Sequence, residues 1–199
     1  MKYPHFFDQV KQIKLKDELS EFLGTFENGV IEYTYTEIVK AAGHSCPTVA
    51  GAYLTCAKAL EKLYPDSLPI RGNIKVEFKN PVDEGVTGVI SNVISNITGA
   101  TQISGFKGIA GKFIRHSLID YGVQINGEIR FTRIDNNAFV DVIYNPTIPP
   151  KPETQQLMQK NISGKANEEE KREFRKLWQE RVEEILINNF DNPDIVIFV

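Results

Sequence analysis

The 199-residue chain has few of the residues that disulfide-bonded and metal-binding proteins use most, with only two cysteines and three histidines. Two cysteines are too few for the disulfide framework of a small secreted domain. No apolar run approaches the roughly 20 residues of a membrane-spanning helix, so we expect no membrane partner. Neither charge dominates, since 23 Lys and Arg accompany 26 Asp and Glu. The basic residues are dispersed, which argues against a nucleic-acid partner.

We also expect no secretory leader, because residues 1–5 lead directly into an amphipathic stretch. Two thiols without such a leader favour reduced cysteines and a cytoplasmic location. The remaining composition is that of an ordinary globular protein, 41% hydrophobic and 25% charged. A chain of this length can bury a core that needs no disulfides.

Helical and strand periods both occur along the chain, which predicts an α+β fold with a C-terminal helical tail. A helix is expected to begin at Thr34 or Thr36 and to end at Gly43. The other expected helices cover residues 17–26, 47–64 and 86–99. The expected strands cover residues 74–78, 118–125, 128–134 and 139–144. Asn126-Gly127 is a strong signal for a hairpin between the second and third of these strands.

Four prolines between residues 146 and 152 predict a stiff linker. We therefore expect an α+β domain over residues 1–148, and a linker with a helical tail over residues 149–199. In the tail, Asn167 and Glu170 have the spacing of a capping box, and an apolar stripe follows them. The last five residues are apolar enough to require burial, against the body or a partner.

Residues 43–47, Gly-His-Ser-Cys-Pro, are the best candidate for a functional centre. They connect two predicted helices, with Pro47 in the first position of the second helix. Imidazole and thiolate are both good zinc ligands, and their spacing lets His44 and Cys46 point into one pocket. The helix N-terminus favours the thiolate form of Cys46, which is then a metal ligand or a catalytic nucleophile. The structural alternative is that Cys46 caps the helix and His44 bonds a nearby carbonyl.

Further metal ligands have to come from other parts of the chain. Cys56 is excluded, because ten helical residues place it about 15 Å from Cys46, whereas a zinc–sulfur bond is about 2.3 Å. We expect Cys56 in the core. The remaining candidates are Glu77, Glu84 and His116, each with a solvated surface position as its alternative.

The glycine-rich segment 105–112 has some features of a phosphate-binding loop. It lacks the Gly-Lys-Ser/Thr ending of a P-loop, however. Lys112 and Arg115 remain candidates for binding an anionic cofactor or substrate. The alternative is a flexible turn with solvated charges.

These motifs resemble those of the FmdE-like family, which takes its name from one component of formylmethanofuran dehydrogenase. Residues 43–47 are similar to the Gly-His-x-Cys-Pro turn of that family, and residues 97–101 to its Leu-Thr-Gly-Cys-Thr segment. The likeness extends over roughly residues 35–187. Its other parts lie at residues 120–122, 130–133, 163–166 and 178–182.

The resemblance implies an α+β fold with a mixed or antiparallel sheet backed by helices, and it implies that His44 and Cys46 are metal ligands. One family cysteine is replaced by Ala100 and another has no counterpart near Val89, so fewer thiolates would hold the metal here. Our leading hypothesis is a metal-binding protein, with zinc as the first choice, whose open coordination position accepts a small anionic or pterin-like ligand. The alternatives are a thiol enzyme with Cys46 as nucleophile and a non-catalytic accessory or scaffold subunit of a redox complex. The expected partners are a second copy, in a homodimer, and subunits of such a complex.

Overall fold

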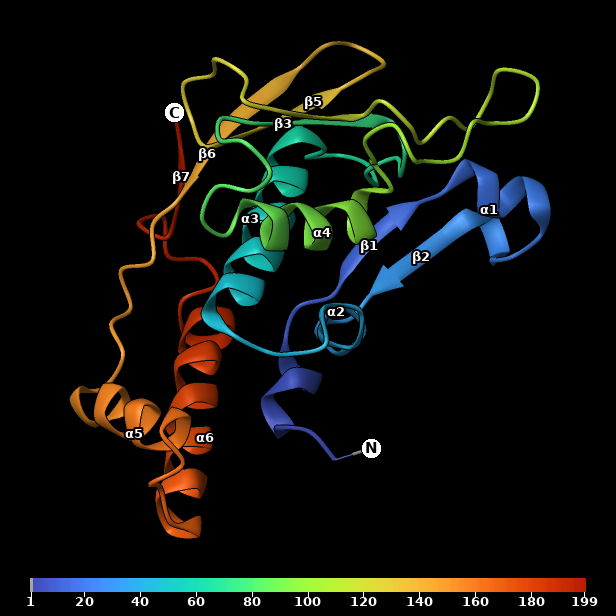
Figure 1. Cartoon of the computed structure of the whole chain (residues 1–199). Coiled ribbons are helices and arrows are strands. Elements are labelled where there is room, and N and C mark those ends of the chain that lie inside the picture. The colour runs from blue at the N-terminus through green and yellow to red at the C-terminus, as the bar shows by residue number, and fades with distance from the viewer. Residues whose placement is uncertain (1) are drawn as a thin grey trace.

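The computed structural model describes residues 2–199 and contains a five-stranded sheet, a two-stranded sheet and the helices that pack on them (Figure 1). The five strands follow the spatial order β4-β3-β5-β6-β7. β3 and β4 are parallel, and the other neighbouring pairs are antiparallel. The bounds of these strands are β3 Ile74–Phe78, β4 Ile119–Tyr121, β5 Ile129–Arg133, β6 Phe139–Tyr144 and β7 Val196–Phe198. The α+β class with a mixed sheet is thereby confirmed.

Two helices, α3 (Pro47–Leu63) and α4 (Thr87–Thr98), cover one face of the five-stranded sheet (Figure 1). The strand β3 reflects this one-sided cover, since Ile74, Val76 and Phe78 are buried and the two residues between them are only partly buried. α3 is buried along most of its length, because it contacts the sheet, α4 and the C-terminal helices. It therefore forms the centre of the core, and it carries the candidate site at its N-terminus.

The two-stranded sheet pairs β1 (Ile13–Lys16) with β2 (Val30–Tyr33) in antiparallel register. The sequence analysis predicted neither of these four-residue strands. A 3-10 turn, η1 (His5–Gln9), precedes β1. The Lys16 N–H donates to the Pro69 carbonyl at 2.9 Å, which attaches this small sheet to the segment before β3.

The helix α1 (Glu18–Leu23), between β1 and β2, lies within the predicted range 17–26. Its apolar residues do not face the core, because Phe22 is 63% exposed and Leu23 is 60% exposed. The helix is only six residues long and is stabilised locally, by an N-cap at Asp17. α1 itself lies at one edge of the molecule (Figure 1).

The predicted hairpin at Asn126-Gly127 is wrong, because β4 and β5 are not neighbours. β3 lies between them, parallel to β4 and antiparallel to β5. Gly127 is needed for a different reason: an added Cβ would lie 2.7 Å from the Val142 carbonyl oxygen, in collision with the backbone of β6. A turn at residues 134–136 joins the paired strands β5 and β6.

The C-terminal region contains α5 (Pro152–Ile162), α6 (Glu168–Glu183) and a π-helical turn, η3 (Glu184–Asn188). α5 and α6 extend away from the five-stranded sheet (Figure 1). The capping box at the start of α6 is confirmed by two hydrogen bonds. The Asn167 N–H donates to a carboxylate oxygen of Glu170 at 3.0 Å, and the Glu170 N–H donates to Asn167 Oδ1 at 2.9 Å.

The chain then returns to the sheet, where β7 pairs with β6. Ile195 and Val196 are 1% and 5% exposed, so this part of the apolar C-terminal segment is buried against the body of its own chain. The domain boundary at residue 148 stays a prediction. The region beyond it contributes the strand β7 to the five-stranded sheet. Over residues 2–199, the helices are too short or too polar to cross a membrane.

Candidate functional site

The Gly-His-Ser-Cys-Pro segment joins α2 (Tyr35–Ala42) to α3, as predicted. Gly43 ends α2 in the left-handed conformation, with φ at 78°. Cys46 is the N-cap of α3: its backbone is extended before Pro47, and its Sγ accepts a hydrogen bond from the Val49 N–H at 3.4 Å. The sulfur therefore lies at the N-terminus of a 17-residue helix, where free N–H groups favour negative charge.

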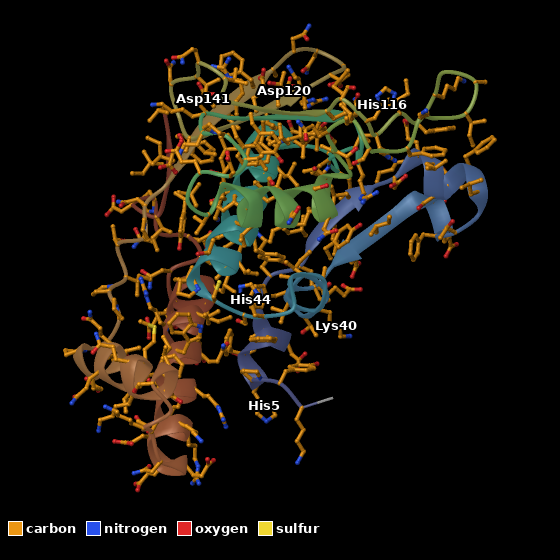
Figure 2. The ribbon with its side chains drawn as sticks, in the orientation of Figure 1. His5, Lys40, His44, His116, Asp120 and Asp141 are labelled. Atoms are coloured by element: carbon orange, nitrogen blue, oxygen red, sulfur yellow. The ribbon has the colours of Figure 1, made fainter. Side chains whose placement is uncertain are left out.

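His44 lies between the two helices with an exposed side chain (Figure 2). Its Nδ1 is 3.0 Å from the Ala42 carbonyl oxygen, and because a carbonyl only accepts, Nδ1 carries the hydrogen. Nε2 of the neutral ring is then the nitrogen with the free lone pair, which is the arrangement of many metal-binding histidines. The contacts of the structural alternative are thus present at both His44 and Cys46. These contacts leave Nε2 of His44 free, and they leave a lone pair available on the Cys46 sulfur.

Ser45 is held by three hydrogen bonds from other parts of the chain. Its carbonyl oxygen accepts from Trp178 Nε1 at 3.1 Å and from Gln179 Nε2 at 3.2 Å, both on α6. Its hydroxyl lies 3.0 Å from the hydroxyl of the buried Tyr35. The sequence analysis missed Trp178 and Gln179 as site residues, and the only signal for them was the family-like segment 178–182. α6 therefore fixes the turn between His44 and Cys46.

A pocket of about 590 Å³, which we name the Cys46 pocket, lies between α3, the start of α4, and α6. Its volume is within the range of small-molecule sites, about 300–1,000 Å³. Much of its wall is apolar or aromatic, and includes Phe78, Ile129, Tyr144 and Trp178. A cavity of this kind suits a ligand with a large apolar surface.

Polar side chains reach the Cys46 pocket from four parts of the chain. Glu84 comes from the segment before α4, Glu128 from the residue before β5, and Arg181 from α6. Burial raises the pKa of the Tyr144 hydroxyl to about 12, so this group is protonated at neutral pH. Of the predicted metal ligands, Cys46 and Glu84 line this pocket, whereas His44 does not.

A family model described as FmdE, Molybdenum formylmethanofuran dehydrogenase operon, matches residues 41–192, well over half of the chain. The chain belongs to the FmdE family. The matched region begins just before the His44–Cys46 turn and ends beyond α6, so it includes every residue named above as part of the Cys46 pocket. A search of curated proteins finds no match to this FmdE-family chain.

In this FmdE-family chain, Glu77 and His116 are not brought to Cys46. Glu77 alternates with buried residues on β3 and pairs with Lys75 at 2.9 Å, on the face of the sheet away from the helices. His116 is exposed, has its Nδ1 2.9 Å from Ser117 Oγ, and lies far from His44 in Figure 2. Within residues 2–199, no three side chains of His, Cys, Asp or Glu are grouped closely enough to hold a metal ion.

Lys112 and Arg115 also lie outside the Cys46 pocket. Arg115 is 7% exposed; its Nη2 donates to Asp17 Oδ1 at 2.8 Å, and its Nη1 donates to the Arg71 carbonyl. Burial lowers the pKa of the Arg115 guanidinium, and the nearby Asp17 carboxylate opposes that shift. Lys112 lines a separate hollow beside α1. Binding of an anionic cofactor by these residues stays a prediction, and the Arg115 guanidinium already pairs with a carboxylate.

Cys56 is fully buried on α3, as expected for a core residue. Burial raises the pKa of its thiol, so it is protonated and shielded from solvent at neutral pH. Cys46 is partly exposed and is therefore the cysteine with the accessible sulfur.

Proposed function

We propose that this FmdE-family protein binds a divalent transition metal, with zinc as the first choice, through His44 Nε2 and Cys46 Sγ beside a small-molecule pocket. The observation that carries the proposal is the hydrogen bond from His44 Nδ1 to the Ala42 carbonyl, since it leaves Nε2 free to coordinate. The position of Cys46 at a helix N-terminus adds support, because zinc binds the thiolate form of cysteine.

Two protein ligands fit a metal site with open coordination positions, and not a structural site in which protein ligands fill every position. A structural zinc ion takes four protein ligands, whereas His44 and Cys46 supply two, and the replaced family cysteine is Ala100. The remaining positions go to water, to a bound ligand, or to a carboxylate such as Glu84, which shares the pocket with Cys46. When bound, an ion in such a site supplies Lewis acidity and lowers the pKa of coordinated water.

The residues around the proposed metal have three separate roles. Trp178 and Gln179 hold the Ser45 carbonyl, which keeps His44 and Cys46 in one turn. The apolar wall removes water from the ligand, and this strengthens any polar contact made inside the pocket. The charged residues Glu84, Glu128 and Arg181 suit a pterin-like ligand with donors and acceptors better than a small anion, because two of the three carry negative charge.

Metal analysis of purified protein tests this proposal. We expect stoichiometric zinc in the wild type and its loss in His44→Ala and Cys46→Ala. His116→Ala is the matched control, because it removes an exposed histidine on another part of the molecule. Full zinc occupancy in both turn variants, or none in the wild type, would contradict the proposal.

A second candidate function is thiol chemistry at Cys46. It is favoured by a partly exposed sulfur that accepts the Val49 N–H at the N-terminus of α3 and lines the pocket. Alkylation by iodoacetamide over a range of pH tests it, since an activated thiolate reacts at lower pH than free cysteine does. A pH profile equal to that of free cysteine would count against a nucleophile. The homodimer and the role as a component of a redox complex stay predictions, and light scattering tests the first.

A further inference from the structure

Arg181 differs from the other arginines of this chain that are at least partly buried. Each of those pairs with a carboxylate: Arg71 and Arg115 with Asp17, Arg130 with Asp141, and Arg133 with Asp135. Arg181 is also partly buried, but it takes part in no ion pair within residues 2–199. The carboxylate beside it on α6, Glu180, pairs with Lys151 instead. The positive charge of Arg181 therefore has no internal counterion.

The guanidinium of Arg181 is fixed in the wall of the Cys46 pocket. Its Nε donates to the Ile148 carbonyl at 2.9 Å, and within residues 2–199 this is the hydrogen bond that its side chain makes. Burial raises the pKa of the Tyr144 hydroxyl, and the charge of Arg181 opposes that shift. The same hydroxyl donates to the Pro47 carbonyl at 3.3 Å, directly after Cys46. The unused Nη1 and Nη2 of Arg181 thus belong to the part of the wall nearest the candidate metal ligands.

Burial distinguishes Arg181 from the other unpaired arginines of the same helix. Arg172 and Arg175 are exposed and lie outside the Cys46 pocket, so water solvates their charges. A partly buried charge keeps less of its hydration and is costly unless an opposite charge is supplied. The guanidinium also presents paired N–H donors in one plane, a geometry that matches the two oxygens of a carboxylate. A carboxylate on a ligand in the pocket would supply the missing partner.

The rest of the pocket limits what else the ligand can be. Glu84 and Glu128 are exposed at its rim, and neither pairs with a cation within residues 2–199. The Glu128 carboxylate accepts from the Tyr144 N–H at 3.2 Å, so it lies at the backbone end of a residue whose hydroxyl end is affected by Arg181. Acidic and basic groups therefore meet different ends of a ligand. The aromatic wall between them suits a flat ring, and the two glutamates favour a singly charged carboxylate over a doubly charged phosphate.

We propose that the Cys46 pocket binds a flat molecule with N–H donors at one end and a carboxylate at the other, and that Arg181 Nη1 and Nη2 donate to this carboxylate. The inference rests on the proposed function, because it takes this pocket as the ligand site beside the metal. Arg181 is then a specificity-determining residue: it distinguishes a carboxylic acid from the neutral amide of the same shape.

The test compares 6-amino-2-naphthoate with 6-amino-2-naphthamide at neutral pH, by isothermal titration calorimetry with the full chain. These probes share a fused ring and an amino donor, and they differ in one charge. The measured quantity is the ratio of their dissociation constants. We expect the wild type to prefer the acid and Arg181→Gln to reduce that preference about tenfold to a hundredfold, the value of hydrogen bonds to a charged group. Arg181→Lys keeps the charge without the planar donors and is expected to retain a smaller preference.

Arg175→Gln is the matched control, because it makes the same change of charge on the same helix outside the pocket. It is expected to leave the ratio unchanged. The affinity for the amide is an internal control for folding, because Arg181→Gln is expected to bind this neutral probe as the wild type does.

Zinc content and a chelator-treated sample separate this inference from the proposed function. An unchanged ratio in Arg181→Gln, or binding of neither probe, overturns the assignment of Arg181 even if the protein contains zinc. A preference for the acid that is lost with the zinc and kept in Arg181→Gln places the carboxylate on the metal, and also overturns it. A wild type without zinc whose preference is lost in Arg181→Gln contradicts the metal proposal and supports the assignment of Arg181.

Discussion

The buried ion pair between Arg115 and Asp17 gives a prediction that separates a structural role of Arg115 from cofactor binding. The two side chains are 8% and 4% exposed, and Arg115 Nη2 lies 2.8 Å from Asp17 Oδ1. Removing one partner of a buried pair costs about 3–5 kcal/mol, because the other charge stays buried without compensation. Asp17 keeps Arg71 Nη1 at 3.0 Å, so Arg115→Ala is expected at the lower end, about 3 kcal/mol.

Urea denaturation and thermal melting measure this change. For a chain of this size, about 3 kcal/mol corresponds to a fall of about 6–12 °C in Tm. Lys112→Ala is the control, because Lys112 is an exposed lysine of the same loop, and its change is expected within about 0.5 kcal/mol. An Arg115→Ala protein whose free energy of unfolding stays within about 1 kcal/mol of the wild type would refute the structural assignment.

Three further predictions follow from the helices around the site. Gly51→Ala is expected to lower the free energy of unfolding by about 1–3 kcal/mol, because the added Cβ overlaps the Tyr144 ring; urea denaturation measures this, and a neutral effect contradicts it. Trp178→Phe keeps a ring but removes the donor to the Ser45 carbonyl, so thermal melting should show a loss of about 1 kcal/mol. Burial raises the pKa of the Cys56 thiol, whereas unfolding restores its ordinary value of about 8.5. The contribution of the Cys56 thiol to the free energy of unfolding is therefore fully present below about pH 8.5. It decreases above that pH, by about 2 kcal/mol at about pH 10. Urea denaturation at about pH 8.5 and at about pH 10 measures this, and the free energy of unfolding of Cys56→Ala should not show that part of the decrease.

Features that depend on neighbouring residues in the chain could be predicted from the sequence. Thr34 caps α2 together with Glu37, and Asn167 begins α6 with a capping box, because each cap is a contact across three residues. Pro47 occupies the first position of α3 for a similarly local reason, its fixed φ angle and missing N–H. These signals placed the His44–Cys46 turn between two helices correctly.

Strand order could not be predicted in the same way, because it depends on pairing between distant segments. Asn126-Gly127 has the composition of a two-residue hairpin, yet β3 pairs with both flanking strands and separates them. Gly127 is required by the backbone of β6, which lies too close for a side chain. A glycine that makes room for another strand and a glycine that forms a turn have the same sequence signature.

The candidate site also depends on contacts between distant segments, so its residues were harder to predict from the sequence. Glu77 and Glu84 were equivalent candidates in the sequence, but the alternation of β3 directs Glu77 away from the helices, while Glu84 reaches the Cys46 pocket.

The position of α6 changes how the C-terminal region is understood. Trp178 and Gln179 are separated from Ser45 by more than 130 residues, yet both donate to its carbonyl oxygen. A shift of α6 would therefore move the backbone between His44 and Cys46 and would also move Trp178 and Arg181 in the wall of the pocket. The family match extends to residue 192 and includes this helix. We therefore expect removal of the C-terminal helices to impair the proposed zinc binding, even where the sheet and α3 still fold.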